Sequence, residues 1–106
     1  MDAQFKRGIV ELLVMKILQK GPSTSHEVIK ALKDAMDVTA NTVYPILRRL
    51  NDKGYASVEK VPSKIGAPRK LYRLSDEGKA RLSNLEGEWK DFLTRALTIL
   101  GGTSDA

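Results

Sequence analysis

Hydrophobic positions recur at helical spacing in four segments of the chain. The first segment, residues 5–20, is apolar on nearly every side. It therefore predicts a helix that must be covered on most faces, by its own domain and by a partner chain. Gly21 and Pro22 end this helix. A Thr-Ser-His-Glu capping box beginning at Thr24 starts a second helix, which we expect to run to about Met36.

A third helix is predicted after the short connection Asp37-Val38, with Thr39 as its N-cap and Gly54 as its end. Its apolar residues follow i, i+3, i+4, i+7 spacing and form one narrow face: Val43, Ile46, Leu47 and Leu50. The opposite face holds Asn41, Tyr44, Pro45, Arg48 and Asp52, with Arg49 on its flank. Pro45 lies beyond the first turn, so it should bend the helix or delay its start. Two helices joined by such a tight turn, the second with a polar outer face, predict a helix-turn-helix.

Two β-prone runs follow, at residues 55–61 and 70–74, on either side of a loop punctuated by Pro and Gly at 62–68. This pattern predicts a two-stranded hairpin. A basic hairpin directly after a polar-faced helix is typical of a winged helix that binds DNA. The predicted fold is therefore mainly α, of the α+β kind: a winged helix-turn-helix with a two-stranded wing and a long C-terminal helix.

The last predicted helix begins at the N-cap Ser75 and runs to about Leu100, before a Gly-Gly pair. Residues spaced three and four apart form one apolar seam: Leu82, Leu85, Trp89, Phe92, Ala96 and Ile99. A second apolar strip beside it contains Leu93, Leu97 and Leu100. Exposing this much apolar surface is costly, so the pattern favours a two-fold dimer. The alternative is a helix that folds back on its own domain. We divide the chain into a DNA-binding domain, residues 1–74, and a dimerisation helix with its tail, residues 75–106.

Positive charge is concentrated in the segment that contains the third helix and the hairpin. Residues 38–73 carry eight Lys and Arg side chains against two carboxylates, a net charge of +6, although the whole chain carries only +5. Residues 1–37 carry +1 and residues 74–106 carry −2. An excess confined to one segment is expected of a surface that faces phosphates. The alternative is a solvated basic face with no partner.

The composition argues against catalytic and metal chemistry. The chain has no cysteine, which excludes disulfides and thiolate metal sites and fits a cytosolic protein. Its one histidine, His26, has no companion for a zinc site or a catalytic dyad, and a surface position is its simpler interpretation. The longest apolar run, Ile9 to Leu18, is too short and too charged to span a bilayer, and no secretory signal is visible. We expect a cytoplasmic protein that is not an enzyme, has no metal or cofactor and does not bind membranes.

The helix-turn-helix interpretation gives roles to particular polar side chains. The residues expected to read base edges lie on the outer face of the third helix: Asn41, Thr42 and Arg48. Arg can bind guanine, Asn can bind adenine, and Thr can contact either a polar edge or a thymine methyl group. Phosphate contacts are expected on the flanks of that helix, from Tyr44 and Arg49, and Thr39 at its start is a further DNA-binding candidate. The wing should contact the DNA backbone or enter the adjacent minor groove through Lys64, Arg69 and Lys70. In a two-fold dimer the two helices would enter successive major grooves about 34 Å apart on a pseudo-palindromic duplex. A winged helix that binds RNA or protein is the alternative.

Three runs of residues resemble a known family: ELLVMKILQKGP at 11–22, TVYPILRRLNDKGY at 42–55 and GAPRKLYRLSDEGKARL at 66–82. Together with the C-terminal helix they resemble PadR-type transcriptional regulators over residues 5–100. The resemblance implies a winged helix-turn-helix, a homodimer, and repression that a small molecule relieves.

Short-tailed members of that family, which this chain resembles in length, use a single C-terminal helix. Some of them stack planar apolar compounds on a tryptophan of that helix, and Trp89 occupies a matching place. In a two-fold dimer an effector pocket is therefore expected across the seam, formed by Leu85, Trp89, Phe92 and Leu93. The alternative is that Trp89 is plain dimer core. Gly87 favours the pocket, because a glycine inside a helix costs about 1 kcal/mol relative to Ala and often marks a close approach.

The chain departs from the family pattern at two places. The second helix begins Thr24-Ser25-His26-Glu27-Val28, where the family has a Tyr-Gly-Tyr-Glu-Ile-like start. This change removes any phosphate contact that the missing aromatic side chain would make. The wing has Ala67-Pro68 where the family has Gly-Arg or a similar pair, which would alter its stiffness and its reach into the minor groove.

Overall fold

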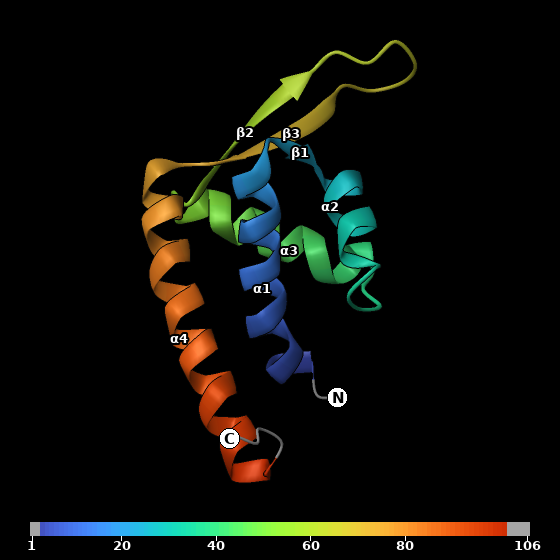
Figure 1. Cartoon of the computed structure of the whole chain (residues 1–106). Coiled ribbons are helices and arrows are strands. Elements are labelled where there is room, and N and C mark those ends of the chain that lie inside the picture. Colours follow the sequence, from blue (N-terminus) through green and yellow to red (C-terminus); the bar gives the residue numbers. More distant parts are fainter. Residues whose placement is uncertain (1–2, 102–106) are drawn as a thin grey trace.

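A computed structural model describes the backbone of residues 3–101 and the side chains of residues 7–101, so the predicted tail lies outside the described residues. Within that part of the chain there are four helices and one three-stranded antiparallel sheet (Figure 1). The elements follow in the order α1 (Ala3–Lys20), β1 (Ser23–Thr24), α2 (Ser25–Leu32), α3 (Ala40–Asp52), β2 (Ala56–Val61), β3 (Arg69–Leu74) and α4 (Asp76–Leu100). The expected winged helix-turn-helix with a long C-terminal helix is confirmed.

Helix α1 stands in the middle of the molecule (Figure 1). It contacts α2, α3 and α4, and the sheet lies across one end of it. The hairpin of β2 and β3 projects from that end, and α4 continues past the other end, which gives the chain an elongated shape of 54 × 28 × 21 Å. Within the described residues, no helix is both long enough and apolar enough to cross a lipid bilayer.

The hydrophobic core is built from the inner faces of all four helices. The predicted inner face of α3 is confirmed, because its four apolar residues are buried: Val43, Ile46, Leu47 and Leu50. Helix α1 supplies the largest group of buried core residues, which includes Val10, Val14, Met15 and Leu18. Leu82 and Leu85 of α4 belong to the same core, so the packing continues across the predicted boundary between residues 74 and 75.

The start of α2 is as predicted, but its end is not. Thr24 Oγ1 accepts a hydrogen bond from the Glu27 N–H at 3.2 Å, and the Glu27 carboxylate accepts one from the Thr24 N–H at 2.8 Å, which completes the capping box. The prediction that this helix reaches Met36 is wrong. It ends at Leu32, whose carbonyl oxygen accepts from the N–H groups of both Ala35 and Met36 in a closing turn. Met36 still packs against the core, which explains why the apolar pattern extended past the helix.

Helix α3 begins directly after its predicted N-cap. Thr39 has extended backbone angles, and its carbonyl oxygen accepts from the N–H groups of Thr42 and Val43. Its side chain makes no capping hydrogen bond. Pro45 lies inside the helix without delaying its start. The chain leaves α3 through Gly54, which has a φ of +80° and therefore takes the left-handed conformation that the sequence predicts there.

The sheet contains one strand more than the predicted two-stranded wing. Its order is β1-β3-β2, with both pairings antiparallel. Strand β1 has only two residues and pairs Ser23 with Tyr72 and Thr24 with Leu71. This short pairing attaches the start of α2 to the wing.

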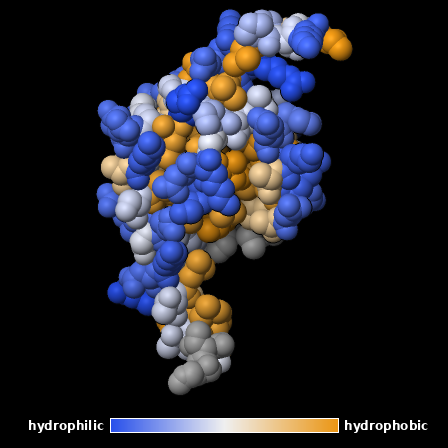
Figure 2. Space-filling model, turned by 45° about the horizontal axis from the view of Figure 1, so that its top comes forward, coloured by the Kyte–Doolittle hydropathy of each residue, from blue (hydrophilic) through white to orange (hydrophobic). Residues whose placement is uncertain are grey.

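Helix α4 lies against its own domain over its first half and projects from it over its second half. Ser75 Oγ accepts from the Gly78 N–H at 3.0 Å and donates to the Gly54 carbonyl oxygen at 2.6 Å, so the predicted N-cap also fixes the helix to the turn after α3. The end at Gly101, with a φ of +76°, is as predicted. Figure 2 shows hydrophobic residues on the projecting end, where the exposed side chains are Phe92, Leu93, Leu97, Ile99 and Leu100. The first half of this helix therefore folds back on its own domain, and for the exposed second half the dimer stays a prediction.

Candidate nucleic-acid interface

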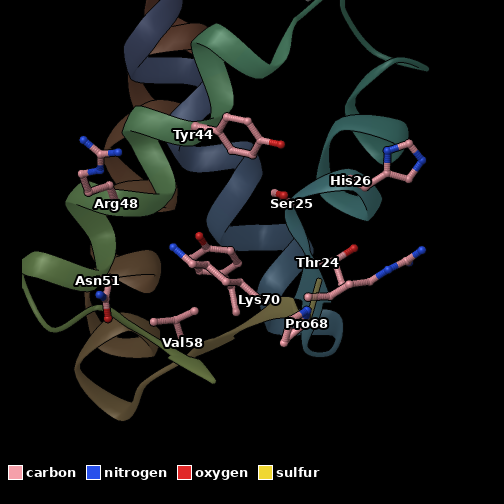
Figure 3. A pocket seen from close by; sticks show the side chains of 11 residues that line it. Thr24, Ser25, His26, Tyr44, Arg48, Asn51, Val58, Pro68 and Lys70 are labelled. Carbon is pink, nitrogen blue, oxygen red and sulfur yellow. The ribbon is translucent and has the colours of Figure 1, made fainter. Parts of the chain in front are cut away.

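An open cleft of about 720 Å³ lies between α3, the start of α2 and the wing (Figure 3). Helix α3 supplies Tyr44, Arg48 and Asn51, and the start of α2 supplies Thr24, Ser25 and His26. The wing supplies Val58, Pro68, Arg69, Lys70 and Tyr72. In Figure 3 the ring of Tyr44 extends from α3 toward the wall on which Ser25 and His26 lie. The cleft therefore joins the polar outer face of the second helix of the helix-turn-helix to the inner face of the hairpin.

The walls of the cleft are positively charged. Arg48, Arg69 and Lys70 are all exposed, and no Asp or Glu is among the described residues that line the cleft. The helical period explains the α3 wall, because Tyr44, Arg48 and Asn51 are spaced four and three residues apart and project from one face. A concave surface with cations on two sides and no carboxylate favours an anionic chain such as a phosphodiester backbone.

Tyr72 lies at the base of this surface as a half-buried phenol. Burial raises the pKa of Tyr72 above its ordinary value, Tyr44 raises it further, and the guanidinium of Arg48 opposes the shift. The phenol therefore keeps its proton throughout the neutral range and remains able to donate a hydrogen bond to an anion.

Four of the predicted DNA-contacting residues come together in the cleft: Tyr44, Arg48, Arg69 and Lys70. Thr39, Asn41 and Thr42 lie at the other end of the surface, at the start of α3, where Thr39 and Asn41 are exposed and Thr42 is half-buried. Lys64 is exposed in the loop between β2 and β3. All of these predicted positions lie on α3 or on the wing, and all except Thr39 at the N-cap and Lys64 in the wing loop belong to a helix or a strand.

Unlike Arg48, Arg49 does not line the cleft and is paired with a carboxylate of α1. Its Nη2 and Nε atoms lie 2.5 Å and 3.2 Å from the same Oε1 atom of Glu11 on α1. The two side chains are only 24% and 22% exposed. This ion pair joins α1 to α3, so the arrangement favours a structural role for Arg49 over the phosphate contact predicted from its flanking position.

Several residues of the cleft were missed by sequence reasoning. Asn51 could have been found, because it lies three residues after Arg48 on the same helical face. Tyr72 and Val58 lie opposite each other on β3 and β2, so the wing register places both side chains on one face of the hairpin. The residues from the start of α2 had no local signal, because tertiary contacts bring them here: the packing of α2 on α3 and the pairing of β1 with β3.

The four predicted effector-binding residues lie along the middle of α4. Leu85 is buried in the core, whereas Phe92 and Leu93 are exposed. Trp89 is half-buried and meets Phe92 edge to face, with ring centroids 5.8 Å apart. A Cβ atom on Gly8 of α1 would lie 3.1 Å from Cζ2 of Trp89, so this glycine lets the indole approach α1 closely.

Gly87 makes no close approach within the described chain, because a Cβ atom there would meet no atom within 4 Å. The tightest helical glycine is Gly78, where a Cβ atom would lie 2.0 Å from the Tyr55 carbonyl oxygen. The close packing that the sequence suggested for α4 therefore occurs near its start, against the turn that leads into β2.

Known proteins share both the sequence pattern and this fold. The model of the transcriptional regulator PadR-like family matches residues 14–84. A PadR-like transcription factor from Bacteroides fragilis is 36% identical, with 91% of this chain and 94% of that chain covered and a TM-score of 0.79. A PadR family transcriptional regulator from Eggerthella lenta is 31% identical, with 94% and 88% covered and a TM-score of 0.82. Bacillus subtilis PadR in complex with operator DNA shares the fold, at 21% identity, over 72% of this chain and 45% of that chain, with a TM-score of 0.67. The chain belongs to the PadR-like family of transcriptional regulators.

Proposed function

We propose that this protein is a cytoplasmic repressor that binds a pseudo-palindromic operator as a homodimer and releases it when a small aromatic compound binds. The cleft between α3 and the wing carries the DNA-binding part of the proposal, because its charged groups are all cationic. Helix α3 enters the major groove and the wing reaches the adjacent minor groove, so the cleft between them receives the sugar-phosphate strand that separates the two grooves. Bacillus subtilis PadR, which has been solved with operator DNA, supports the use of this fold for such binding.

The outer face of α3 divides into residues that read bases and residues that hold phosphates. Asn41, Thr42 and Arg48 are proposed to contact base edges, since their side chains can match the hydrogen-bonding pattern of the major groove. Phosphate contacts are assigned to the remaining polar groups on the surface: Thr39, Tyr44, Lys64, Arg69 and Lys70. Arg49 is assigned to the ion pair with Glu11 instead.

Two substitutions test this division. Arg48→Ala should weaken binding selectively at one base position by roughly 1–3 kcal/mol, and Lys64→Ala should weaken operator and random DNA alike and reduce the salt slope by about 1. Lys79→Ala provides the control, because it removes the same charge from a side chain of α4 that does not line the cleft. The measurement is a titration of labelled operator and random duplex at several salt concentrations. Equal losses on both duplexes for both variants would refute the division, and equal competition by structured RNA would refute operator recognition.

The exposed second half of α4 supports the homodimer. Five large apolar side chains are exposed there, and a second copy of the same helix would cover them. Leu93→Glu should convert the dimer into a monomer in sedimentation experiments, because it places a charge in the proposed seam. Thr98→Glu adds the same charge on the polar face of the helix and should leave the dimer intact. A wild-type monomer at micromolar concentration would contradict the proposal.

The effector site is proposed where Trp89 of one copy faces its equivalent across the seam. Leu85, Phe92 and Leu93 surround the indole on the same helix, so a planar aromatic compound would find apolar walls and an aromatic face. Such a compound relieves repression only if it binds the operator-competent and incompetent dimers with different affinities. Planar aromatic compounds should quench the fluorescence of Trp89 and weaken operator binding. An unchanged spectrum across a diverse set of compounds would count against this site.

A further inference from the structure

One large apolar side chain has no place in either proposed surface. Ile65 is 89% exposed, more than any other large hydrophobic residue in the part of the chain that the structure describes. The other exposed ones are already assigned: Tyr44 and Val58 line the cleft, and the rest belong to the projecting half of α4. Ile65 lies in the loop between β2 and β3, at the far end of the wing.

The loop holds Ile65 in a defined position. The hydroxyl of Ser63 donates a hydrogen bond to the Ile65 carbonyl oxygen at 2.8 Å and accepts one from the Ile65 N–H at 3.4 Å. Gly66 follows with a φ of +84°, a conformation that glycine adopts without strain and that turns the chain back toward β3. One side chain thus satisfies both backbone groups of Ile65, and the turn leaves its side chain pointing outward.

The surroundings of Ile65 are basic rather than apolar. Lys64 precedes it, and Arg69 and Lys70 stand at the base of the loop, where β3 begins. Figure 2 shows the wing as a largely hydrophilic projection with hydrophobic colour at its far end. An apolar tip on a basic wing matches the minor groove of DNA, which presents two phosphate rows at its edges and stacked bases at its floor.

We propose that Ile65 acts as an apolar wedge that enters the minor groove beside the half-site and partly unstacks one base step. This inference rests on the proposed DNA-binding function and adds a specificity-determining residue to it. Proteins that bind the minor groove insert Ile, Leu, Phe, Met or Pro in this way. Pyrimidine-purine steps such as TA and CA/TG unstack most easily, so the wedge selects for these steps without a hydrogen bond to a base.

The charge-neutral variant Ile65→Ala tests the wedge. Because Ile65 is exposed, its truncation leaves the core and the folding of the wing unchanged. Operator affinity should fall by up to about fiftyfold, as expected when three carbon atoms are removed from a fully buried apolar contact. The salt slope should stay the same, because no phosphate contact is lost. Lys64→Ala is the matched control on the neighbouring residue, and it should reduce the slope without changing the preference for a base step.

The step preference gives the more specific measurement. Operators are first selected from random duplexes with the wild-type protein, and the step beneath the wing is located by footprinting. The wild-type protein should lose affinity when that step is changed from TA to GC, and Ile65→Ala should bind both duplexes equally. A 2-aminopurine base placed at the step should brighten when the wild-type protein binds and stay quenched with Ile65→Ala.

The outcomes separate this inference from the function on which it rests. If Ile65→Ala keeps the wild-type affinity, step preference and 2-aminopurine signal, the wedge is refuted and operator binding stands. If the selection with the wild-type protein yields no preferred duplex, the proposed function itself fails. If Ile65→Ala flattens the salt slope as Lys64→Ala does, Ile65 merely orients a phosphate contact and the wedge is again refuted.

Discussion

Replacing Glu11 by Gln removes the carboxylate that joins α1 to the proposed recognition helix α3. In the structure two nitrogen atoms of the Arg49 guanidinium lie 2.5 Å and 3.2 Å from one oxygen atom of Glu11. Both side chains are about a quarter exposed. The substitution leaves a polar group of the same shape in place, so it removes the charge without opening a cavity.

The expected loss of stability lies between two known limits. Exposed ion pairs contribute about 0.2–1 kcal/mol, and removing one partner of a fully buried pair costs about 3–5 kcal/mol. With a quarter of each side chain exposed, we expect a coupling free energy of about 1–2 kcal/mol between Glu11 and Arg49. For a chain of this length, each kcal/mol corresponds to roughly 4–8 °C in Tm.

A double-mutant cycle measures this coupling directly. Glu11→Gln, Arg49→Gln and the double variant are unfolded in urea alongside the wild type, at one protomer concentration because the proposed dimer makes stability depend on concentration. Equal slopes for the four proteins would show that only stability has changed. A coupling free energy near zero would refute the structural role of the pair.

DNA binding by the same variants separates two roles for Arg49. If Arg49 contacts a phosphate, Glu11→Gln frees it and tightens binding to every duplex, and Arg49→Gln weakens binding and lowers the salt slope. If the pair positions α3, both variants weaken operator binding by a similar factor and leave the salt slope unchanged. We expect the second result. Opposite effects of the two substitutions would return Arg49 to the DNA surface.

Three further predictions concern glycine packing and the cap of α2. Gly78→Ala should destabilise the protein by about 3 kcal/mol or more, because the new Cβ atom would lie 2.0 Å from the Tyr55 carbonyl oxygen. Gly87→Ala on the same helix meets no atom within 4 Å and should stabilise the protein by about 0.5–1 kcal/mol. Thermal unfolding of the two variants compares these effects. Thr24→Ala should cost about 1 kcal/mol in urea unfolding, since it removes the capping hydroxyl. Hydrogen bonds from the backbone and the hydroxyl of Thr24 lower the pKa of Glu27. The contribution of this carboxylate to stability is therefore present above pH 4.5 and is lost as pH falls through the lowered pKa. Glu27→Gln should flatten this part of the plot of unfolding free energy against pH.

The sequence predicts the elements whose signals are local. The buried face of α3 follows from its helical period, and the caps at Thr24 and Ser75 follow from residue types that bond to the backbone three residues away. The end of α3 at Gly54 follows from its need for a positive φ. In each case the stabilising partner lies within one helical turn, so no tertiary information is needed.

The features that sequence reasoning missed depend on partners far along the chain. Strand β1 has two residues and exists only because β3, almost fifty positions later, supplies its hydrogen-bonding partner. Arg49 is separated from Glu11 by 38 positions, and the helical wheel shows only that it lies on a flank. The end of α2 was misplaced because Met36 is apolar and packs on the core from a turn. An apolar pattern reports burial, and it does not distinguish a helix from a turn that is packed equally well.

The candidate site illustrates the same limit at the level of function. Its cationic groups could be chosen from the sequence because α3 and the wing are consecutive. The third wall was indicated only by the family resemblance, since residues Thr24 to His26 reach the cleft through tertiary contacts, namely the packing of α2 on α3 and the pairing of β1 with β3. This wall is also where the chain departs from the family pattern, so the departure changes the shape and polarity of the cleft itself. With Thr24 and His26 in place of two tyrosines, the proposed phosphate strand would have more room and fewer apolar contacts.

Helix α1 explains how the proposed effector site and the DNA surface could be coupled. Its predicted all-round apolar character reflects its central place, and three of its other residues contact neighbouring helices. Gly8 admits Trp89 of α4, Lys16 donates a 3.0 Å hydrogen bond to Glu86 of α4, and Glu11 holds Arg49 of α3. Gly8 and Glu11 are three residues apart and lie on neighbouring positions of one helix. A ligand that displaces Trp89 would therefore act on α1 within one turn of the ion pair that positions α3. Coupling of this kind requires Glu11→Gln to reduce the effect of the ligand on operator affinity, even though Glu11 lies in neither proposed binding site.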